Sequence, residues 1–193
     1  MEHRLEPVLT LADALERLET LLPDYDPDLY ESLNPPVAES DLQVLQNVIE
    51  PHELHPDIEA LLRWHDGQIR GRWWPLIESG SLLTAESAGK HYLQMGENCE
   101  PFQWSSSWVP IAHEGWYTIV VECALPLAGM VVDAGFPDPP QPKAFSLMHM
   151  MRCVCNLIEA NIPLEAPERG PATASWMDDR NAVLRRTWPH FLQ

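Results

Sequence analysis

WVPIAHEGWYTIVVECALPLAGMVVD, residues Trp108–Asp133, is the stretch that decides the fold. It contains three runs rich in β-branched and aromatic residues, which are typical of half-buried strands. A short turn containing glycine, His113-Glu114-Gly115, separates the first run from the second, and ALPLA separates the second from the third. The stretch therefore predicts a three-stranded antiparallel meander with strands at 108–112, 116–123 and 129–133.

The middle strand of this meander has two unlike faces, because successive side chains point to opposite sides of a sheet. One face is wholly apolar, and we expect helices to cover it. The other face is mixed, and we expect part of it to meet solvent or a partner. The apolar face consists of Tyr117, Ile119, Val121 and Cys123, and the mixed face of Trp116, Thr118, Val120 and Glu122.

Amphipathic helices are predicted on the amino-terminal side of the meander. The first begins after the N-cap Thr10 and ends at Pro23, and the acidic, proline-punctuated stretch 24–36 is interpreted as a surface connection. Ser40 is the expected N-cap of the second helix, which Pro51 ends.

Two further helices precede the strands. The third begins at Pro56, has His65 among its inner positions, and is closed by Gly67 in a left-handed conformation. A strand-like segment follows at 73–77, and Thr84 opens a fourth helix. Residues 96–107 show no clear period and are predicted to be a loop.

The carboxy-terminal part is predicted to hold the most periodic helix of the chain, at 144–161. Its apolar stripe should pack on the Ile119/Val121 face of the sheet; the stripe comprises Leu147, Met151, Val154 and Ile158. Residues 136–142 are expected to cross the surface, and 163–171 to form a linker. A last amphipathic helix, capped by Ser175, either packs in cis or docks on a second subunit and makes a homodimer. Its apolar residues are Trp176, Val183, Leu184, Thr187 and Phe191.

These elements together predict an α+β fold: a central, twisted, mainly antiparallel sheet with helices packed mostly on one face, plus a carboxy-terminal helix. Residues 1–163 are expected to form a single domain with an amino-terminal helix. Residues 164–193 are expected to form the linker and the terminal amphipathic helix.

The charge of the chain is strongly asymmetric. The formal net charge of the 193 residues is −17. The part before Arg169 holds 8 Lys and Arg against 27 Asp and Glu, whereas the remainder holds four Arg and two Asp. An acidic body repels nucleic acid and membrane surfaces and attracts basic proteins. The alternative interpretation is that the acidity only keeps the protein in solution.

Neither a membrane span nor a secretory signal is predicted from the sequence. The four cysteines lack zinc-ribbon and CxxC spacing, which indicates free thiols in a reducing cytoplasm.

Five motifs follow one another along the chain: LNPPVAESDLQVLQ (Leu33–Gln46), LHPDIEALLRWHDGQ (Leu54–Gln68), SLLTAESAGKHYLQM (Ser81–Met95), WSSSWVPIA (Trp104–Ala112) and GMVVD (Gly129–Asp133). Together and in this order they resemble the SUKH superfamily, which includes fungal cell-wall-synthesis regulators and bacterial immunity proteins. The resemblance covers roughly residues 21–163.

The sequence departs from the SUKH pattern in its second meander strand. Gly115 is followed by Trp116-Tyr117 in place of the family's Gly-Asp pair, and Glu122 stands at the later acidic position.

The resemblance implies an α+β domain that binds proteins and catalyses no reaction. Its bacterial members are associated with immunity to polymorphic toxins, many of them nucleases, so a basic toxin domain is the expected partner. A regulatory scaffold with a partner other than a toxin is the alternative.

The aromatic residues suggest where such a partner would bind. Tryptophan is enriched at binding hot spots, and Trp74 and Trp116 are the predicted anchors, whereas Trp108 is expected to cover the sheet. Glu114, Glu122 and Asp133 would supply a charged rim.

Catalytic and metal chemistry find little support in the sequence. A hydrolase would use His65 or His113 with Asp66 or Glu114, but adjacent residues rarely form a working dyad, and no nucleophile elbow accompanies them. Cys153 and Cys155 point about 200° apart on a helix, and His149 with Cys153 could offer only two ligands. We therefore expect no catalytic residue, no metal and no cofactor.

Overall fold

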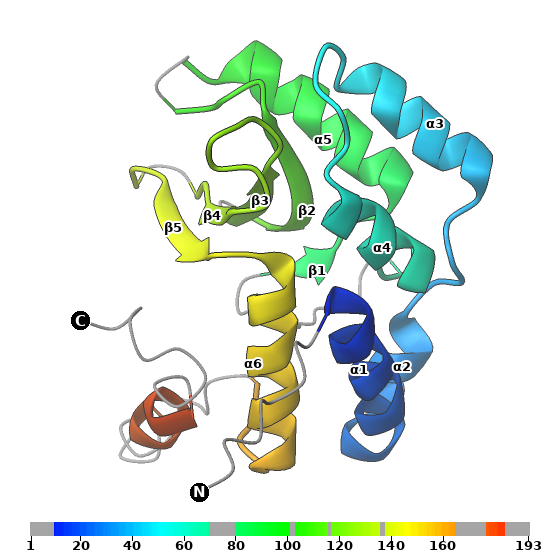
Figure 1. Ribbon diagram of the computed structural model, residues 1–193, viewed down its shortest axis with the longest axis vertical. Coiled ribbons are helices and arrows are strands. Elements are labelled where there is room, and N and C mark those ends of the chain that lie inside the picture. The colour runs from blue at the N-terminus through cyan, green and yellow to red at the C-terminus, as the bar shows by residue number, and fades with distance from the viewer. Residues whose placement is uncertain are drawn as a thin grey trace, which may run out of the picture.

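The computed structural model describes residues 10–69, 80–100, 103–115, 117–135, 138–164 and 177–183. These residues form helices and one antiparallel sheet, so the predicted α+β class is confirmed (Figure 1). In chain order the elements are α1 Leu11–Tyr25, α2 Pro27–Ser32, α3 Glu39–Val48, α4 Pro56–Trp64, β1 Ser81–Leu82, α5 Ala85–Asn98, β2 Trp108–Glu114, β3 Tyr117–Glu122, β4 Val131–Asp133, β5 Gln141–Ala144 and α6 Leu147–Glu159, followed by a short helical segment at 177–183.

The sheet follows the order of the chain, β1-β2-β3-β4-β5, and every neighbouring pair is antiparallel. The meander predicted from Trp108–Asp133 is therefore confirmed as β2, β3 and β4. A β-bulge interrupts β2 between Pro110 and Ala112. Proline has no N–H for a ladder and is tolerated at bulges. Because of the bulge, the consecutive residues Ile111 and Ala112 both belong to the main core.

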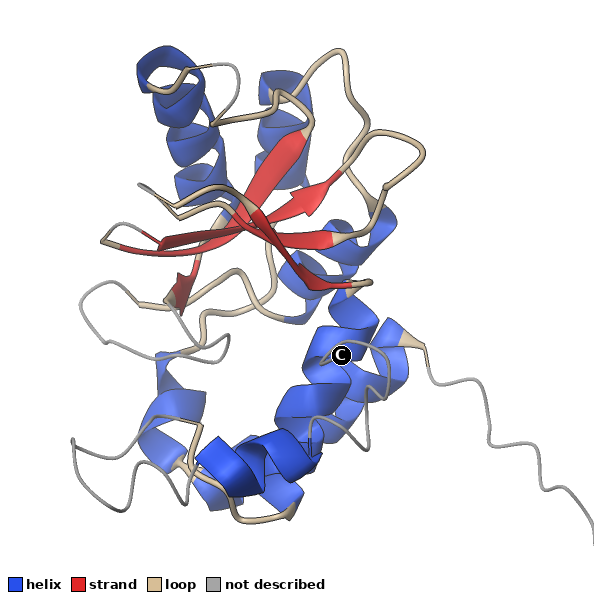
Figure 2. Ribbon diagram, turned by 90° about the vertical axis from the view of Figure 1, so that its left-hand side faces the viewer, coloured by secondary structure: helices blue, strands red, loops and turns tan. Residues whose placement is uncertain are grey.

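Both faces of β3 are buried from Thr118 to Val121, and Figure 2 shows helices on the two sides of the sheet. Tyr117, which was predicted to lie under helices on the apolar face, is instead 51% exposed at the start of the strand. Ile119 and Val121 join the main core with residues of α1, α4 and α6. On the other face, Val120 forms a second cluster with Trp104, against which Tyr92 and Met95 of α5 pack. Thr118 and Val120 are only 2% and 0% exposed. The mixed face is thus closed at these two residues.

The predicted apolar stripe of α6 is buried in the main core, which also holds Ile119 and Val121. The helix packs chiefly along α1, with fewer contacts to α4 and β5, so the sheet face is not its main neighbour as had been predicted. Ser146 accepts a hydrogen bond from the His149 backbone N–H and caps the helix. The helix begins at Leu147 and not at Ala144, because Ala144 is the last residue of β5, a strand that the sequence analysis missed.

The end of α1 and the stretch that follows it differ from the prediction. Pro23 lies inside α1, which continues to Tyr25. A proline this close to a helix end removes a single hydrogen bond, and the neighbouring Leu22 is fully buried. The supposed surface connection contains α2, in which Asp26 caps Leu29, a core residue with 0% exposure. An N-cap Asp followed by Pro at the first helical position was the overlooked signal.

The start of α3 and the end of α5 also differ from the prediction. Helix α3 begins at Glu39 after the N-cap Ala38, so Ser40 is not its cap. The preceding Val37 donates its backbone N–H to the Leu62 carbonyl of α4, which fixes where the helix starts. Helix α5 begins after Thr84 as predicted, but it runs to Asn98, into the predicted loop. The predicted strand at 73–77 lies outside the described residues.

The motif His65-Asp66-Gly67-Gln68 ties four parts of the fold together. The Asp66 carboxylate accepts a hydrogen bond from the first backbone N–H of α5, at Ala85. The Gln68 side chain accepts one from Leu82 of β1 and donates one to the Ser32 hydroxyl. Gly67 adopts the predicted left-handed conformation, with φ 67°.

The ring of His65 is held by two partners and is half-buried, as a helix-capping residue. It contacts the Asn34 carbonyl at 2.6 Å and the Glu19 carboxylate at 3.1 Å. Glu19 also accepts hydrogen bonds from the hydroxyl of Tyr30 and the indole N–H of Trp64. These hydrogen bonds hold the pKa of Glu19 below its usual value despite the opposing effect of burial. The carboxylate therefore joins α1, α2 and α4.

The helical segment 177–183 lies within the terminal region where a last helix was predicted. Val183 packs against the main core, which favours packing in cis over docking on a second subunit. The expected apolar residues Trp176, Leu184, Thr187 and Phe191 and the expected cap Ser175 lie outside the described residues. The expected boundary at residue 163, between the domain and the carboxy-terminal linker and helix, stays a prediction.

Candidate protein-binding surface

The structure does not gather the predicted binding residues into one patch. Glu122 pairs with Trp108 at one end of the β2–β3 ladder, whereas Glu114 pairs with Tyr117 at the other end. Asp133 pairs with Ile119, nearer the Glu114 end. The predicted anchors Trp74 and Trp116 lie outside the described residues.

Glu122 and Asp133 also have internal partners. The Glu122 carboxylate accepts hydrogen bonds from the Trp108 indole N–H at 3.0 Å and from the Ala124 backbone N–H at 2.8 Å. Asp133 lies 3.9 Å from the Lys143 ammonium and accepts from the Gly135 N–H. Trp108 is half-buried against the second cluster, so its predicted role as sheet cover is confirmed. The hydrogen bond from its indole N–H to Glu122 holds Trp108 against the sheet.

Three loops meet at the Glu122 end of the sheet: 49–55 between α3 and α4, 104–107 before β2, and 123–130 between β3 and β4. The Cys123 N–H donates to the Ser107 carbonyl, which joins the second loop to the third. The His52 ring lies 3.4 Å from the Ser106 hydroxyl, which joins the first loop to the second. We call this region the loop end. It presents side chains from three parts of the chain on one surface.

The loop end carries two exposed leucines. Leu125 is 88% exposed and Leu127 is 53% exposed, and both lie in the 123–130 loop. Residues 49–55 and 122–130 contain three carboxylates, Glu50, Glu53 and Glu122, and no Lys or Arg. The exposed side chains of Leu125 and Leu127, which we call the tip, therefore lie among loops that carry acidic residues and no basic ones.

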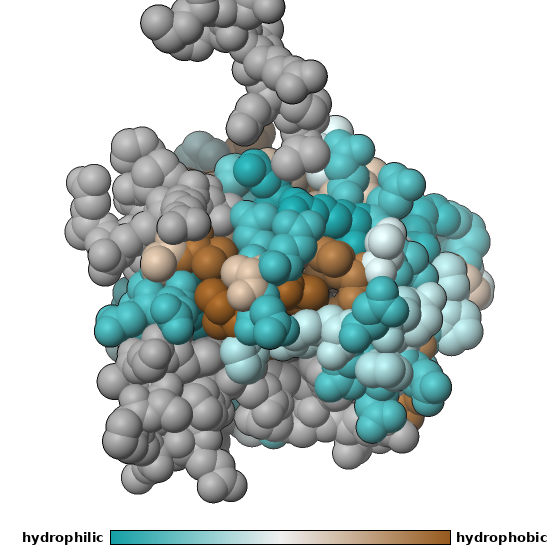
Figure 3. Space-filling model, turned by 90° about the horizontal axis from the view of Figure 1, so that it is seen from below, coloured by the Kyte–Doolittle hydropathy of each residue, from teal (hydrophilic) through white to brown (hydrophobic). Residues whose placement is uncertain are grey.

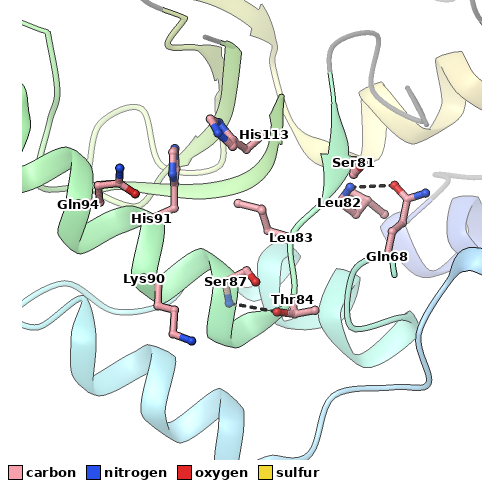
Figure 4. A pocket seen from close by; sticks show the side chains of 10 residues that line it. All are labelled: Gln68, Ser81, Leu82, Leu83, Thr84, Ser87, Lys90, His91, Gln94 and His113. Carbon is pink, nitrogen blue, oxygen red and sulfur yellow. Dashed lines mark hydrogen bonds between the residues drawn. The ribbon is translucent and has the colours of Figure 1, made fainter. Parts of the chain in front are cut away.

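The other end of the sheet carries a groove between α5 and the strands β1 and β2, with a volume of about 350 Å³ (Figure 4). His91 of α5 and His113 of β2 face one another there, with ring centroids 4.1 Å apart. Both rings contact the hydroxyl of the buried Thr118, His91 through Nε2 at 3.0 Å and His113 through Nδ1 at 3.1 Å. A second hollow of about 410 Å³ shares these histidines and extends toward Met95 and Cys99.

The environment of the two histidines keeps both rings neutral. Burial, reinforced by the neighbouring His113, lowers the pKa of His91 from 6.5 to about 4. Burial also lowers the pKa of His113. The Nδ1 atom of His113 lies 3.1 Å from the Tyr117 carbonyl, which can only accept, so this nitrogen carries the proton. The Thr118 hydroxyl can then donate to Nε2 of His91.

The lowered pKa of His91 predicts a loss of stability in mild acid. The unfolded chain binds more protons than the folded chain between the folded pKa of about 4 and the unfolded value of 6.5. The free energy of unfolding therefore falls as pH falls through this window. Because the ring is only partly buried, we expect a loss of about 1 kcal/mol between about pH 7.5 and about pH 5.5. Urea denaturation at the two pH values measures this loss. In the His91→Gln variant, the free energy of unfolding should change less between the two pH values. An unchanged slope in that variant would rule out His91 as the cause.

The residue pairs of the hydrolase alternative do not converge. The His65 ring contacts Glu19 and Asn34, and the Asp66 carboxylate caps α5. His113 lines the groove, whereas Glu114 is not among the groove's lining residues. In the described part of the chain, no side-chain hydrogen bond joins His65 to Asp66 or His113 to Glu114.

Metal-ligating side chains do not cluster within the described ranges, where no group of three His, Cys, Asp or Glu is placed to hold a metal ion. Cys153 and Cys155 are buried as small apolar residues, and burial raises their pKa values to about 12 and about 11. The ring of His149 lies against the Ser146 hydroxyl at the start of α6.

The acidic charge is concentrated in the first half of the chain. Residues 10–69 hold fourteen Asp and Glu and two Arg, a formal charge of −12. Arg17 pairs with Glu159, and Arg63 pairs with Glu39 and Glu59. Both arginines are thus engaged with carboxylates of the same chain. At the end of the molecule seen in Figure 3, hydrophilic side chains surround a central group of hydrophobic ones.

No model of a known protein family matches the chain, and no curated protein matches it. None of the helices in the described part combines the length and apolar character needed to cross a bilayer.

The histidine pair and the leucine tip were both missed by sequence reasoning. His91 and His113 are 22 positions apart, and nothing in their spacing marks them as neighbours. ALPLA was interpreted only as a chain reversal, although two leucines in a turn are themselves a signal, since turns favour Gly, Pro, Asn, Asp and Ser.

Proposed function

We propose that this chain is a SUKH-type protein-binding module without catalytic activity, and that it acts as an immunity-type protein that neutralises a cognate toxin by occlusion. Support comes from the five ordered motifs and from the acidity of the body. A nuclease domain presents Lys and Arg to the phosphates of nucleic acid and so carries a basic surface. An acidic surface complements such a domain and repels nucleic acid itself.

The observation that carries the proposal is the distribution of charge in residues 10–69. The formal charge of −12 lies on helices α1 to α4 and their connections, and the two arginines there are already paired. A field of one sign accelerates the encounter with an oppositely charged protein. The free thiols of the chain fit a reducing cytoplasm, which we propose as its location.

The test is capture of partners from the native host at low salt, with identification by mass spectrometry. We expect a basic protein that is lost at high salt. A variant neutralised on the acidic half should capture less of it, whereas a matched variant neutralised elsewhere by the same charge should capture nearly as much. The first carries Glu16→Gln, Glu31→Gln and Asp41→Asn, and the control carries Glu97→Gln, Glu100→Gln and Asp138→Asn, all at exposed positions.

Co-expression of the captured protein with the chain then separates immunity from regulation. Protection of the host from a toxic partner supports immunity. Binding without any protection would instead identify a regulatory scaffold of the same fold. An acidic partner, or capture that ignores the charge variants, would contradict the proposal.

A further inference from the structure

The loop 123–130 presents an apolar side chain to solvent in a fixed position. Leu125, at 88%, is the most exposed large apolar residue in the described part of the chain, and Leu127 lies two positions further on. Single exposed apolar residues are common on proteins and need no explanation. Two in one short loop, at an end of the sheet whose loops carry the exposed Glu50 and Glu53 but no Lys or Arg, form a distinct surface feature.

Backbone hydrogen bonds close this loop at its base. The Gly129 N–H donates to the Glu122 carbonyl at 2.7 Å, and the Glu122 N–H donates to the Met130 carbonyl at 2.9 Å. Within the loop, the Met130 N–H donates to the Leu127 carbonyl at 3.0 Å. The Glu122 side chain adds a bond to the Ala124 N–H. The two leucines are therefore carried by a loop that is tied at both ends.

The loop is also packed against its neighbour from the α3–α4 connection. Gly129 has φ 89°, and a Cβ added there would lie 2.9 Å from Nε2 of His55. The positive φ favours glycine here, and the His55 ring lies directly over the position that a side chain would take. A loop ordered before binding loses little conformational entropy when a partner arrives, which favours affinity.

The charge around the tip indicates what kind of surface it fits. The neighbouring loop 49–55 contributes Glu50 and Glu53, which are both exposed, and neither this loop nor loop 104–107 contains Lys or Arg. A second copy of this chain would bring two acidic rims together, which costs free energy. A partner pocket that is apolar inside and rimmed by Lys or Arg complements both features.

We infer that the Leu125–Leu127 tip is the contact that inserts into an apolar, cation-rimmed pocket of a basic protein partner. The inference rests on the proposed function and names the surface that performs it. The acidic half of the chain supplies long-range attraction, and the tip supplies the desolvated contact after encounter.

The test uses the full chain and the partner that low-salt capture identifies. Leu125→Ser should weaken the measured affinity about ten- to a hundredfold, the range expected for losing one buried leucine side chain. The melting temperature should not change, because the side chain is exposed in the free protein. Leu93→Ser on α5, where Leu93 is 50% exposed, is the matched control and should leave affinity nearly unchanged.

A photo-crosslinking residue in place of Leu125 provides the second measurement. We expect a crosslink to the same basic partner, mapped by mass spectrometry to an apolar pocket beside Lys or Arg. A crosslink to a second copy of the chain would overturn the inference. It would also be overturned if Leu125→Ser bound the partner with unchanged affinity while that binding remained sensitive to salt. In both cases the proposed function would stand if that salt-sensitive partner is found. Failure to capture any basic partner would overturn the function and the inference together.

Discussion

Replacing Val154 with aspartate should lower the free energy of unfolding by roughly 3–5 kcal/mol, the cost of an uncompensated buried charge. Val154 is 6% exposed on α6 and lies in the main core cluster with Ile119 and Val121. For a chain of this size the loss corresponds to a fall in melting temperature of roughly 10 °C. Thermal and urea denaturation of the purified variant measure the effect.

The matched control is the same substitution on an exposed helix face. Val44 of α3 is 57% exposed, and Val44→Asp should change the free energy of unfolding by less than about 1 kcal/mol. Equal effects of the two substitutions would show that α6 does not contribute its apolar stripe to the core.

Gly67→Ala should destabilise the protein by about 3 kcal/mol or more. The added Cβ would lie 2.5 Å from both the Leu83 carbonyl carbon and the Thr84 nitrogen. These are backbone atoms at the junction of β1 and α5, so no side-chain rotation can relieve the contact. The left-handed φ of 67° adds about 1 kcal/mol for a residue with a Cβ. Urea denaturation of the variant measures the total loss in the free energy of unfolding.

Gly115→Ala separates the two contributions to this cost. Gly115 has φ 54°, but nothing lies within 4 Å of an added Cβ. The substitution there should cost only the conformational part, about 1 kcal/mol. If Gly67→Ala were no more damaging than Gly115→Ala, the close approach of the two backbones would be contradicted.

The sheet and the long helices could be predicted because their signals are local. Alternation in β3 placed Ile119 and Val121 on one face, and the structure buries both in the main core. The stripe of α6 and the Thr84 cap of α5 follow from spacing and from an N-cap residue in the same way. These are the cases in which periodicity and tertiary packing agree.

The errors arose where packing overrode a local signal. Pro23 predicted the end of α1, but the helix continues for two more residues beside the fully buried Leu22. Strand β5 could not be predicted from a proline-rich stretch, because its pairing depends on β4. The cover of Val120 by Trp104 and residues of α5 likewise depends on contacts between distant parts of the chain.

The site was predicted less well than the fold, because it depends on contacts between distant residues. Glu122 was expected to present a charge to a partner, but its carboxylate fixes Trp108 and the following loop. The exposed feature beside it is Leu125. Composition indicated the sign of the surface charge. Which residues are placed to contact a partner depends on the three-dimensional structure.

The motif that most resembles the SUKH pattern has an architectural role in this chain. The side chains of His65, Asp66 and Gln68 all engage partners within the protein, and Gly67 supplies a left-handed turn against the β1–α5 junction. The motif therefore positions elements of the fold, and the binding surface is formed by other residues.

The central claim is that an acidic body recognises a basic protein, and its most direct test is the affinity for the captured partner as a function of salt. Raising ionic strength from about 50 mM to about 300 mM shortens the distance over which charges act to well below 10 Å. We predict that the association rate falls by about tenfold or more over this range, with a smaller change in the dissociation rate. An association rate that stays constant across the range would contradict the account.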